Sequence, residues 1–74
     1  MPIMLAPLCR ALSVVRVSSD EKTKRHLENL GIAAGAELSV LSNDSGSVIL
    51  RVRDGRMALD KRVAAGIFVT VKEG

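Results

Sequence analysis

The sequence predicts a mostly β fold with one inserted helix, closed into a small five-stranded antiparallel barrel. Short segments of β-branched or alternating apolar residues are separated by turn formers, and only residues 18–30 have helical spacing. The chain has 74 residues, which suffices for one hydrophobic core. We therefore expect a single domain over residues 1–74, which begins with an N-terminal arm of about residues 1–11.

The strands are expected where apolar side chains alternate or β-branched residues cluster. These segments are residues 12–17, 37–41, 47–53, 56–59 and 67–71. The alternation is clearest in the third segment, and Asp54-Gly55 after it is a typical hairpin dipeptide. The cluster Ser42 to Gly46 predicts another turn, and residues 60–65 a single helical turn closed by Gly66. The candidate interior comprises Val15, Val17, Leu38, Val40, Val48, Leu50, Val52, Met57, Leu59, Ile67, Val69 and Val71.

The helix has a start signal and a stop signal. Ser18 and Glu21 stand in capping-box spacing, and Ser19 or Asp20 could cap the helix instead. Thr23, Leu27 and Leu30 fall on one helix face, and Gly31 follows where a left-handed residue is wanted. Gly35 belongs to the turn after the helix.

Composition excludes several classes of protein. Hydrophobic residues make up 47% of the chain but aromatic residues only 1%, so the core must be aliphatic. The single cysteine, Cys9, cannot form an intramolecular disulfide, which favours a reducing, cytoplasmic location. The apolar residues 1–8 are interrupted by two prolines and are too short to span a membrane, so we expect an extended segment with Leu5 and Leu8 on the core.

Charge and motifs do not favour an enzyme or a nucleic-acid-binding protein. The net charge is only +3, and the basic residues Arg51, Arg53, Arg56, Lys61 and Arg62 have no aromatic neighbours on which bases could stack. Residues for an acid, a base and a nucleophile do not gather in any pattern, so we expect no catalysis. We also expect that no cofactor is required. His26, Cys9, Asp20 and Glu21 are weak candidates for adventitious binding of a divalent metal.

The stretch from Arg25 to Leu38 resembles the FeoA family, whose pattern is roughly R-x-L-x-x-L-G-hydrophobic-x-P-G-x-x-hydrophobic. Leu27, Leu30, Gly31 and Gly35 carry the resemblance, which extends over about residues 5–71 and includes Gly55. The sequence departs from the family at Ala11 and Ala34, where glycine and proline are usual. The resemblance implies an SH3-like barrel and a role in bacterial ferrous iron uptake, assisting a membrane transporter that carries a cytosolic GTPase domain.

The helix and the turn after it are the expected docking surface for that transporter, because loops on a rigid barrel often carry recognition. The expected docking residues combine charge with a small apolar tip: Lys24, Arg25, Glu28, Ile32 and Ala33. On this interpretation the protein is cytoplasmic, is recruited to the inner face of the membrane, and self-associates weakly through strand edges. The alternative is a regulatory interaction domain in metal-dependent transcription control, since some such regulators carry a similar domain.

Overall fold

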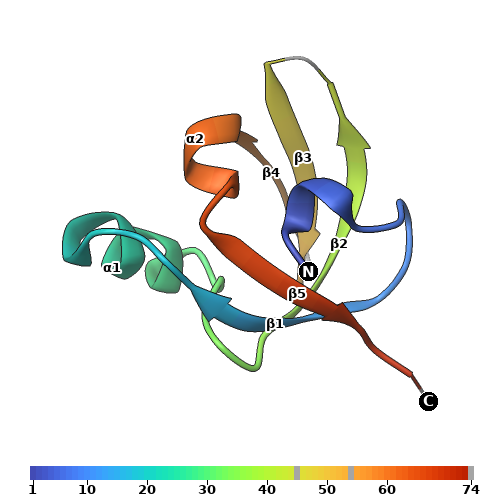
Figure 1. Cartoon of the computed structure of the whole chain (residues 1–74), viewed down its shortest axis with the longest axis horizontal. Helices are drawn as coiled ribbons and strands as arrows, with labels where there is room; N and C mark the ends of the chain where they lie inside the picture. The colour runs from blue at the N-terminus through green and yellow to red at the C-terminus, as the bar shows by residue number, and fades with distance from the viewer. Residues whose placement is uncertain (45, 54, 74) are drawn as a thin grey trace.

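The structure is a computed structural model that describes residues 1–44, 46–53 and 55–73 (Figure 1). The elements in chain order are η1 (Ile3–Leu5), β1 (Leu12–Val17), α1 (Glu21–Asn29), β2 (Glu37–Asn43), β3 (Ser47–Val52), β4 (Gly55–Asp60), α2 (Lys61–Ala64) and β5 (Ile67–Val71). The strands form one five-stranded sheet in the order β4-β3-β2-β1-β5, with antiparallel neighbours throughout. The predicted mostly β fold with an inserted helix is therefore confirmed.

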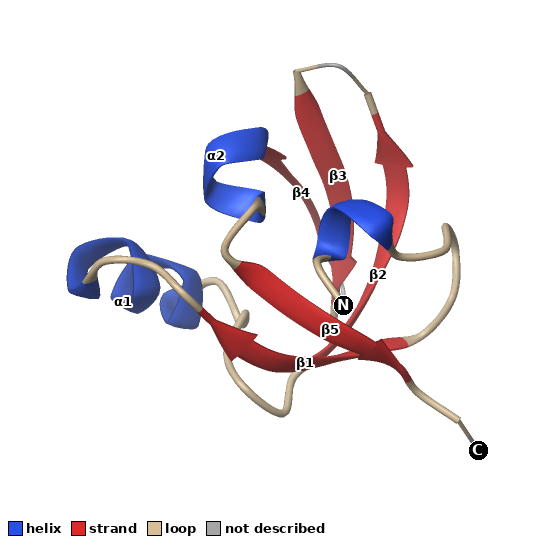
Figure 2. Ribbon diagram, in the orientation of Figure 1, coloured by secondary structure: helices blue, strands red, loops and turns tan. Residues whose placement is uncertain are grey.

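The sheet curls around a single aliphatic core, with α1 beside the barrel at the end of β1 (Figure 2). The buried side chains are Ile3, Leu12, Val14, Val17, Leu27, Ile32, Leu38, Val40, Val48, Leu50, Val52, Leu59, Ala64, Ile67 and Val69. Within the described residues, no polar or charged side chain is buried with them. Burial of apolar area alone therefore stabilises this core.

The alternation predicted for the third strand is confirmed, whereas the expectation that Val15 of β1 faces the interior is wrong. Val48, Leu50 and Val52 are buried. In β1, Val14 is buried and Val15 is 55% exposed, although Val15 was expected inside. The pairing of β1 with β5 shifts register between Val14 and Arg16, as in a β-bulge. Because a bulge inserts one unpaired residue, it reverses which side chains face the core.

Strand β2 is longer than expected, and two of the predicted turn residues are not described. β2 continues through Asn43, two residues beyond the expected end, and its pairing with β3 shifts register between Val40 and Ser42. The part of the predicted turn at Ser45 lies outside the described residues, and so does Asp54 of the hairpin dipeptide. On either side of Asp54, Val52 pairs with Gly55 across the β3–β4 hairpin.

The N-terminal segment packs differently from the expectation. Ile3 is fully buried, whereas Leu5 is 75% exposed and Leu8 is 51% exposed, so the expected core contacts of Leu5 and Leu8 are wrong. Pro2 forms an antiparallel bridge with Phe68, and the Val69 N–H donates to the Met1 carbonyl at 2.8 Å. These contacts hold residues 1–3 against the free side of β5 and direct Ile3 inward.

The expected helical turn near residue 60 is α2. The Asp60 carboxylate caps it by accepting a hydrogen bond from the Val63 N–H at 3.0 Å. Gly66 follows because a Cβ at that position would overlap the carbonyl oxygen of Ser18. The Ser18 N–H in turn donates to the Gly66 carbonyl at 2.7 Å, which joins the end of β1 to the start of β5. Met57 and Val71, both expected inside, are half-buried at the margin of the core.

Candidate docking surface

Helix α1 begins two residues later than a Ser18 capping box requires. Its N-cap residue is Asp20, whose side chain makes no capping hydrogen bond. The Ser18 N–H, which a capping box would pair with the Glu21 side chain, donates to the Gly66 carbonyl instead. Of the three cap candidates, the structure therefore selects Asp20. The helix is held on the barrel by Leu27, which is fully buried, while Leu30 is 38% exposed.

The C-terminal end of α1 is a Schellman turn centred on Gly31. The Gly31 N–H donates to the Glu28 carbonyl at 3.0 Å, and the Ile32 N–H donates to the Leu27 carbonyl at 2.8 Å. Gly31 has a φ of 91°, and a Cβ there would lie 3.2 Å from Cγ1 of Val52. The left-handed residue predicted at this helix end is therefore confirmed.

The Schellman turn also corrects one expected docking residue. Such turns bring the residue after the glycine onto the last helical turn, where an apolar side chain packs inward. Ile32 is accordingly fully buried in the core together with Leu27. The expectation that Ile32 forms an exposed apolar tip is wrong, because its side chain anchors the loop instead.

The loop from residue 33 to residue 36 is hydrogen-bonded to β1. The Gly35 N–H donates to the Val14 carbonyl at 2.8 Å, and the Val14 N–H donates to the Ala36 carbonyl at 2.8 Å. The Ala36 N–H closes the turn by donating to the Ala33 carbonyl at 2.9 Å, and Gly35 has a φ of 91°. The end of α1, this turn and β1 are thus tied together.

A hollow of about 320 Å³ lies where α1, the turn and β1 meet. We call it the helix hollow, and it is lined by Arg16, Val17, Lys24, Glu28, Ala33 and Ala34. Lys24 and Glu28 are one helical turn apart, so both side chains lie on the same face of α1. The hollow is therefore bordered by two cations and one carboxylate over small apolar residues.

Arg16 is a member of the helix hollow that sequence reasoning did not select. Its guanidinium carbon lies 4.5 Å from the centre of the Phe68 ring, a cation–π distance. The bulge in β1 sets the direction of Arg16, and its contact with the chain's single aromatic residue depends on the pairing of β1 with β5. The only signal in the sequence is that Arg16 is the one charged residue in this strand.

The helix hollow gathers three of the five expected docking residues: Lys24, Glu28 and Ala33. Arg25 is exposed on α1 but does not line the hollow, and Ile32 is buried. Gly55, which was expected to have a structural role, is the first residue of β4.

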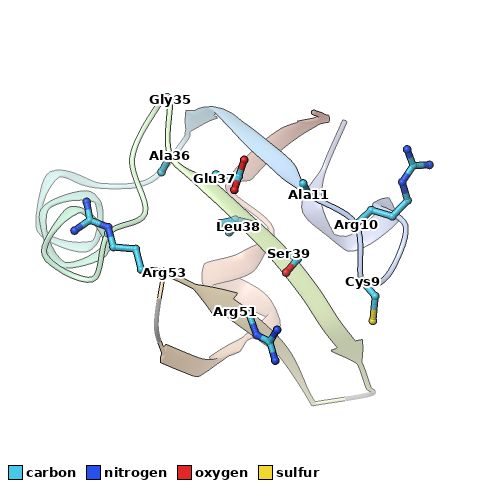
Figure 3. A pocket seen from close by; sticks show the side chains of 11 residues that line it. Cys9, Arg10, Ala11, Gly35, Ala36, Glu37, Leu38, Ser39, Arg51 and Arg53 are labelled. Atoms are coloured by element: carbon cyan, nitrogen blue, oxygen red, sulfur yellow. The ribbon is translucent and has the colours of Figure 1, made fainter. Parts of the chain in front are cut away.

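The weak metal-ligand candidates do not form a site. In the described part of the chain, no three side chains of His, Cys, Asp or Glu lie together where they could hold an ion. Cys9 is exposed in the loop before β1, on the other side of the barrel from the α1 helix that carries His26 and Glu21 (Figure 3). No described helix is long and apolar enough to cross a membrane.

The fold and the exposed hollow define a small SH3-like β-barrel module with a charged surface beside its inserted helix. The chain belongs to the FeoA domain family, whose model matches residues 1–71. No curated protein matches the sequence significantly.

Solved structures share the fold at low sequence identity. An iron uptake regulatory protein (FeoA) superposes with a TM-score of 0.83 at 23% identity, over 93% of both chains. The FeoA protein from Chlorobium tepidum gives a TM-score of 0.84 at 23% identity, over 100% of this chain and 72% of that one. ScaR with bound Zn²⁺ gives 0.86 at 20% identity, over 97% of this chain but only 37% of the longer ScaR chain.

Proposed function

We propose that this protein is a non-catalytic accessory protein of bacterial ferrous iron uptake. It works in the cytoplasm, requires no cofactor, and docks on the cytosolic GTPase-bearing part of the membrane ferrous transporter. Docking modulates the activity or the assembly of the transporter and recruits the protein to the inner face of the membrane. Membership of the FeoA domain family supports the iron-uptake context.

The observation that carries the proposed docking site is the helix hollow. Lys24 and Glu28 present opposite charges on one face of α1, next to Ala33. Ala33 belongs to a loop that is held in place by backbone hydrogen bonds and by the buried side chain of Ile32. A rigid, mixed-charge depression suits a partner surface that inserts a small apolar group between polar contacts. The ordering of this loop before binding lowers the entropic cost of association.

The test measures binding to the isolated GTPase domain and to the full transporter in detergent, with and without nucleotide. Lys24→Glu reverses a charge inside the helix hollow, and we expect it to weaken binding about tenfold. Lys22→Glu is the matched control, because Lys22 is exposed on the same helix but does not line the hollow. The control should bind within about twofold of the wild type, because exposed charges outside an interface contribute little.

Two results would contradict this proposal. Failure of the wild-type protein to bind either target, in any nucleotide state, would remove the transporter as the partner. Equal weakening by both substitutions would show that overall charge matters and the hollow does not.

The likeness to a manganese-dependent transcriptional repressor, with a TM-score of 0.83 at 20% identity, favours one second candidate, a regulatory interaction domain in metal-dependent transcription control. Retention of a DNA or RNA fragment at low salt, lost on raising the salt, would support a version that binds nucleic acid directly. Absence of retention at low salt would exclude it.

A further inference from the structure

A second charged surface, distinct from the helix hollow, lies beside β2, β3, β4 and the loop before β1. Its cationic side chains, which we call the arginine face, are Arg10, Arg51, Arg53 and Arg56, and all four are exposed. Arg51 and Arg56 are directly opposite each other in the β3–β4 ladder. Directly opposed residues in antiparallel strands have Cβ atoms about 5 Å apart, and like charges there destabilise the sheet.

A groove of about 510 Å³ runs along β2 beside these arginines. Arg51 and Arg53 border it on the β3 side, and residues 9–11 border it on the other side (Figure 3). Small side chains and glycines widen it: Ala11, Gly31, Gly35, Ala36 and Ser39. The groove is therefore open, it is bordered by Arg10, Arg51 and Arg53, and most of its other lining side chains are small.

The one carboxylate in the lining does not neutralise these arginines. Glu37 forms an ion pair with Lys72, with Oε1 and Nζ 2.6 Å apart, and this is the only ion pair among the described residues. The lining thus contains three arginines at separate points and a carboxylate that already has a cation beside it (Figure 3). The excess of positive charge predicts an anionic ligand.

We propose that the arginine face and its groove bind an acidic peptide segment of a partner protein in an extended conformation. Guanidinium groups bind carboxylates through paired N–H donors, and the lining arginines, one before β1 and two at the end of β3, suit carboxylates spaced along an extended chain. A groove that runs along a strand fits a peptide in an extended conformation. The lining contains no aromatic ring for stacking nucleic-acid bases, and its apolar members are too small or too buried to enter a lipid bilayer.

This inference does not rest on the proposed function. The arginine face shares no residue with the helix hollow. Lys24→Glu and Arg51→Gln therefore report on separate surfaces, and either proposal can fail while the other stands.

The test is calorimetric titration with a peptide of alternating glutamate and threonine, about ten residues long, so that every second side chain is acidic on one side of an extended chain. A peptide with glutamine in place of glutamate is the matched ligand. We expect binding only of the acidic peptide, weakened at higher salt because the contacts are ionic. Arg51→Gln should weaken this binding about tenfold, whereas Arg25→Gln, the same change on α1, should leave it unchanged.

Thermal unfolding of the same variants separates binding from folding. Arg51→Gln removes one of two opposed cations, so it should preserve or raise the melting temperature while binding is weakened. A fall in melting temperature would contradict the repulsion between Arg51 and Arg56.

Three outcomes would overturn the proposal: equal binding of the glutamine peptide, no binding of either peptide at low salt, or unchanged affinity in Arg51→Gln. Tighter binding of single-stranded DNA or of phosphatidylserine vesicles than of the acidic peptide would assign the arginine face to a different class of partner.

Discussion

Ile32 and Gly31 illustrate how one glycine decides the role of its neighbour. The left-handed backbone of Gly31 reverses the chain after α1, and the reversal places Ile32 against the core. The same backbone path leaves Ala33 at the edge of the helix hollow. The apolar residue of the family motif therefore serves the packing of the loop, while the charges before it on α1 remain available to a partner.

Truncation of Ile32 should destabilise the protein because it leaves a cavity in the core. Ile32→Ala is expected to lower the free energy of unfolding by about 2–5 kcal/mol, the usual range for a buried aliphatic residue. Chemical denaturation followed by circular dichroism measures this change. Leu5→Ala is the control, since Leu5 is 75% exposed and its truncation should cost less than about 0.5 kcal/mol. Similar losses for both variants would contradict the burial of Ile32.

At the scale of elements, the two helices begin in different ways although both have an aspartate at the N-cap. Asp60 accepts a hydrogen bond from the Val63 N–H, whereas the side chain of Asp20 makes no capping hydrogen bond. The backbone conformations of the two aspartates are nearly the same, with ψ at 161° in each. The difference therefore lies in the side chains.

Replacing the two aspartates tests this difference. Asp60→Ala should lower the free energy of unfolding by about 1 kcal/mol, because it removes the hydrogen bond that begins α2. Asp20→Ala should lower it by less than about half as much, since only the favourable charge at the helix N-terminus is lost. Equilibrium unfolding in urea compares the two variants under the same conditions. A larger loss for Asp20→Ala would show that the capping roles are the reverse of those described.

At the scale of the whole molecule, residues 1–3 complete the barrel. They bridge to β5 through Pro2 and Phe68, and they supply the fully buried Ile3. β5 is one end of the strand order, so this segment covers an edge that would otherwise offer unpaired backbone groups.

Removal of residues 1–5 should therefore change both stability and association. We expect the melting temperature to fall by at least about 8 °C, because losing a buried isoleucine costs about 2 kcal/mol or more and each kcal/mol corresponds to at least about 4 °C in a domain of this size. Sedimentation should also detect association through the uncovered β5 edge. Ile3→Ala is the control that keeps the edge covered, so it should lose stability but show no added association. A truncated protein that remains monomeric and fully stable would exclude this role.

Residues whose roles follow from local chemistry were predicted correctly. The alternation of Val48, Leu50 and Val52 defines an inward side, and the position of Gly31 after a helical segment defines the helix end. Leu27 is buried on the helix face that its spacing predicts. Each inference needs only the repeat of a helix or strand, or the backbone freedom of glycine.

Residues whose roles depend on distant partners were not predictable in this way. Val15 is exposed because of a register shift against β5, and Ile3 is buried because its segment pairs with that same strand. Arg16 joins the helix hollow only through the packing of α1 beside β1.

The sequence by itself determined the mostly β class, the inserted helix, the aliphatic core and the charged face of α1, because these depend on composition and on short-range periodicity. Only the tertiary structure decided which edge residues 1–3 cover, where the strands bulge, and that Arg51 stands opposite Arg56 above a groove bordered by the loop before β1. Those features arise from contacts between residues far apart in the chain. Such contacts depend on which strands pair and in which register, and on which side chains are buried. Neither can be worked out from one short segment of the sequence.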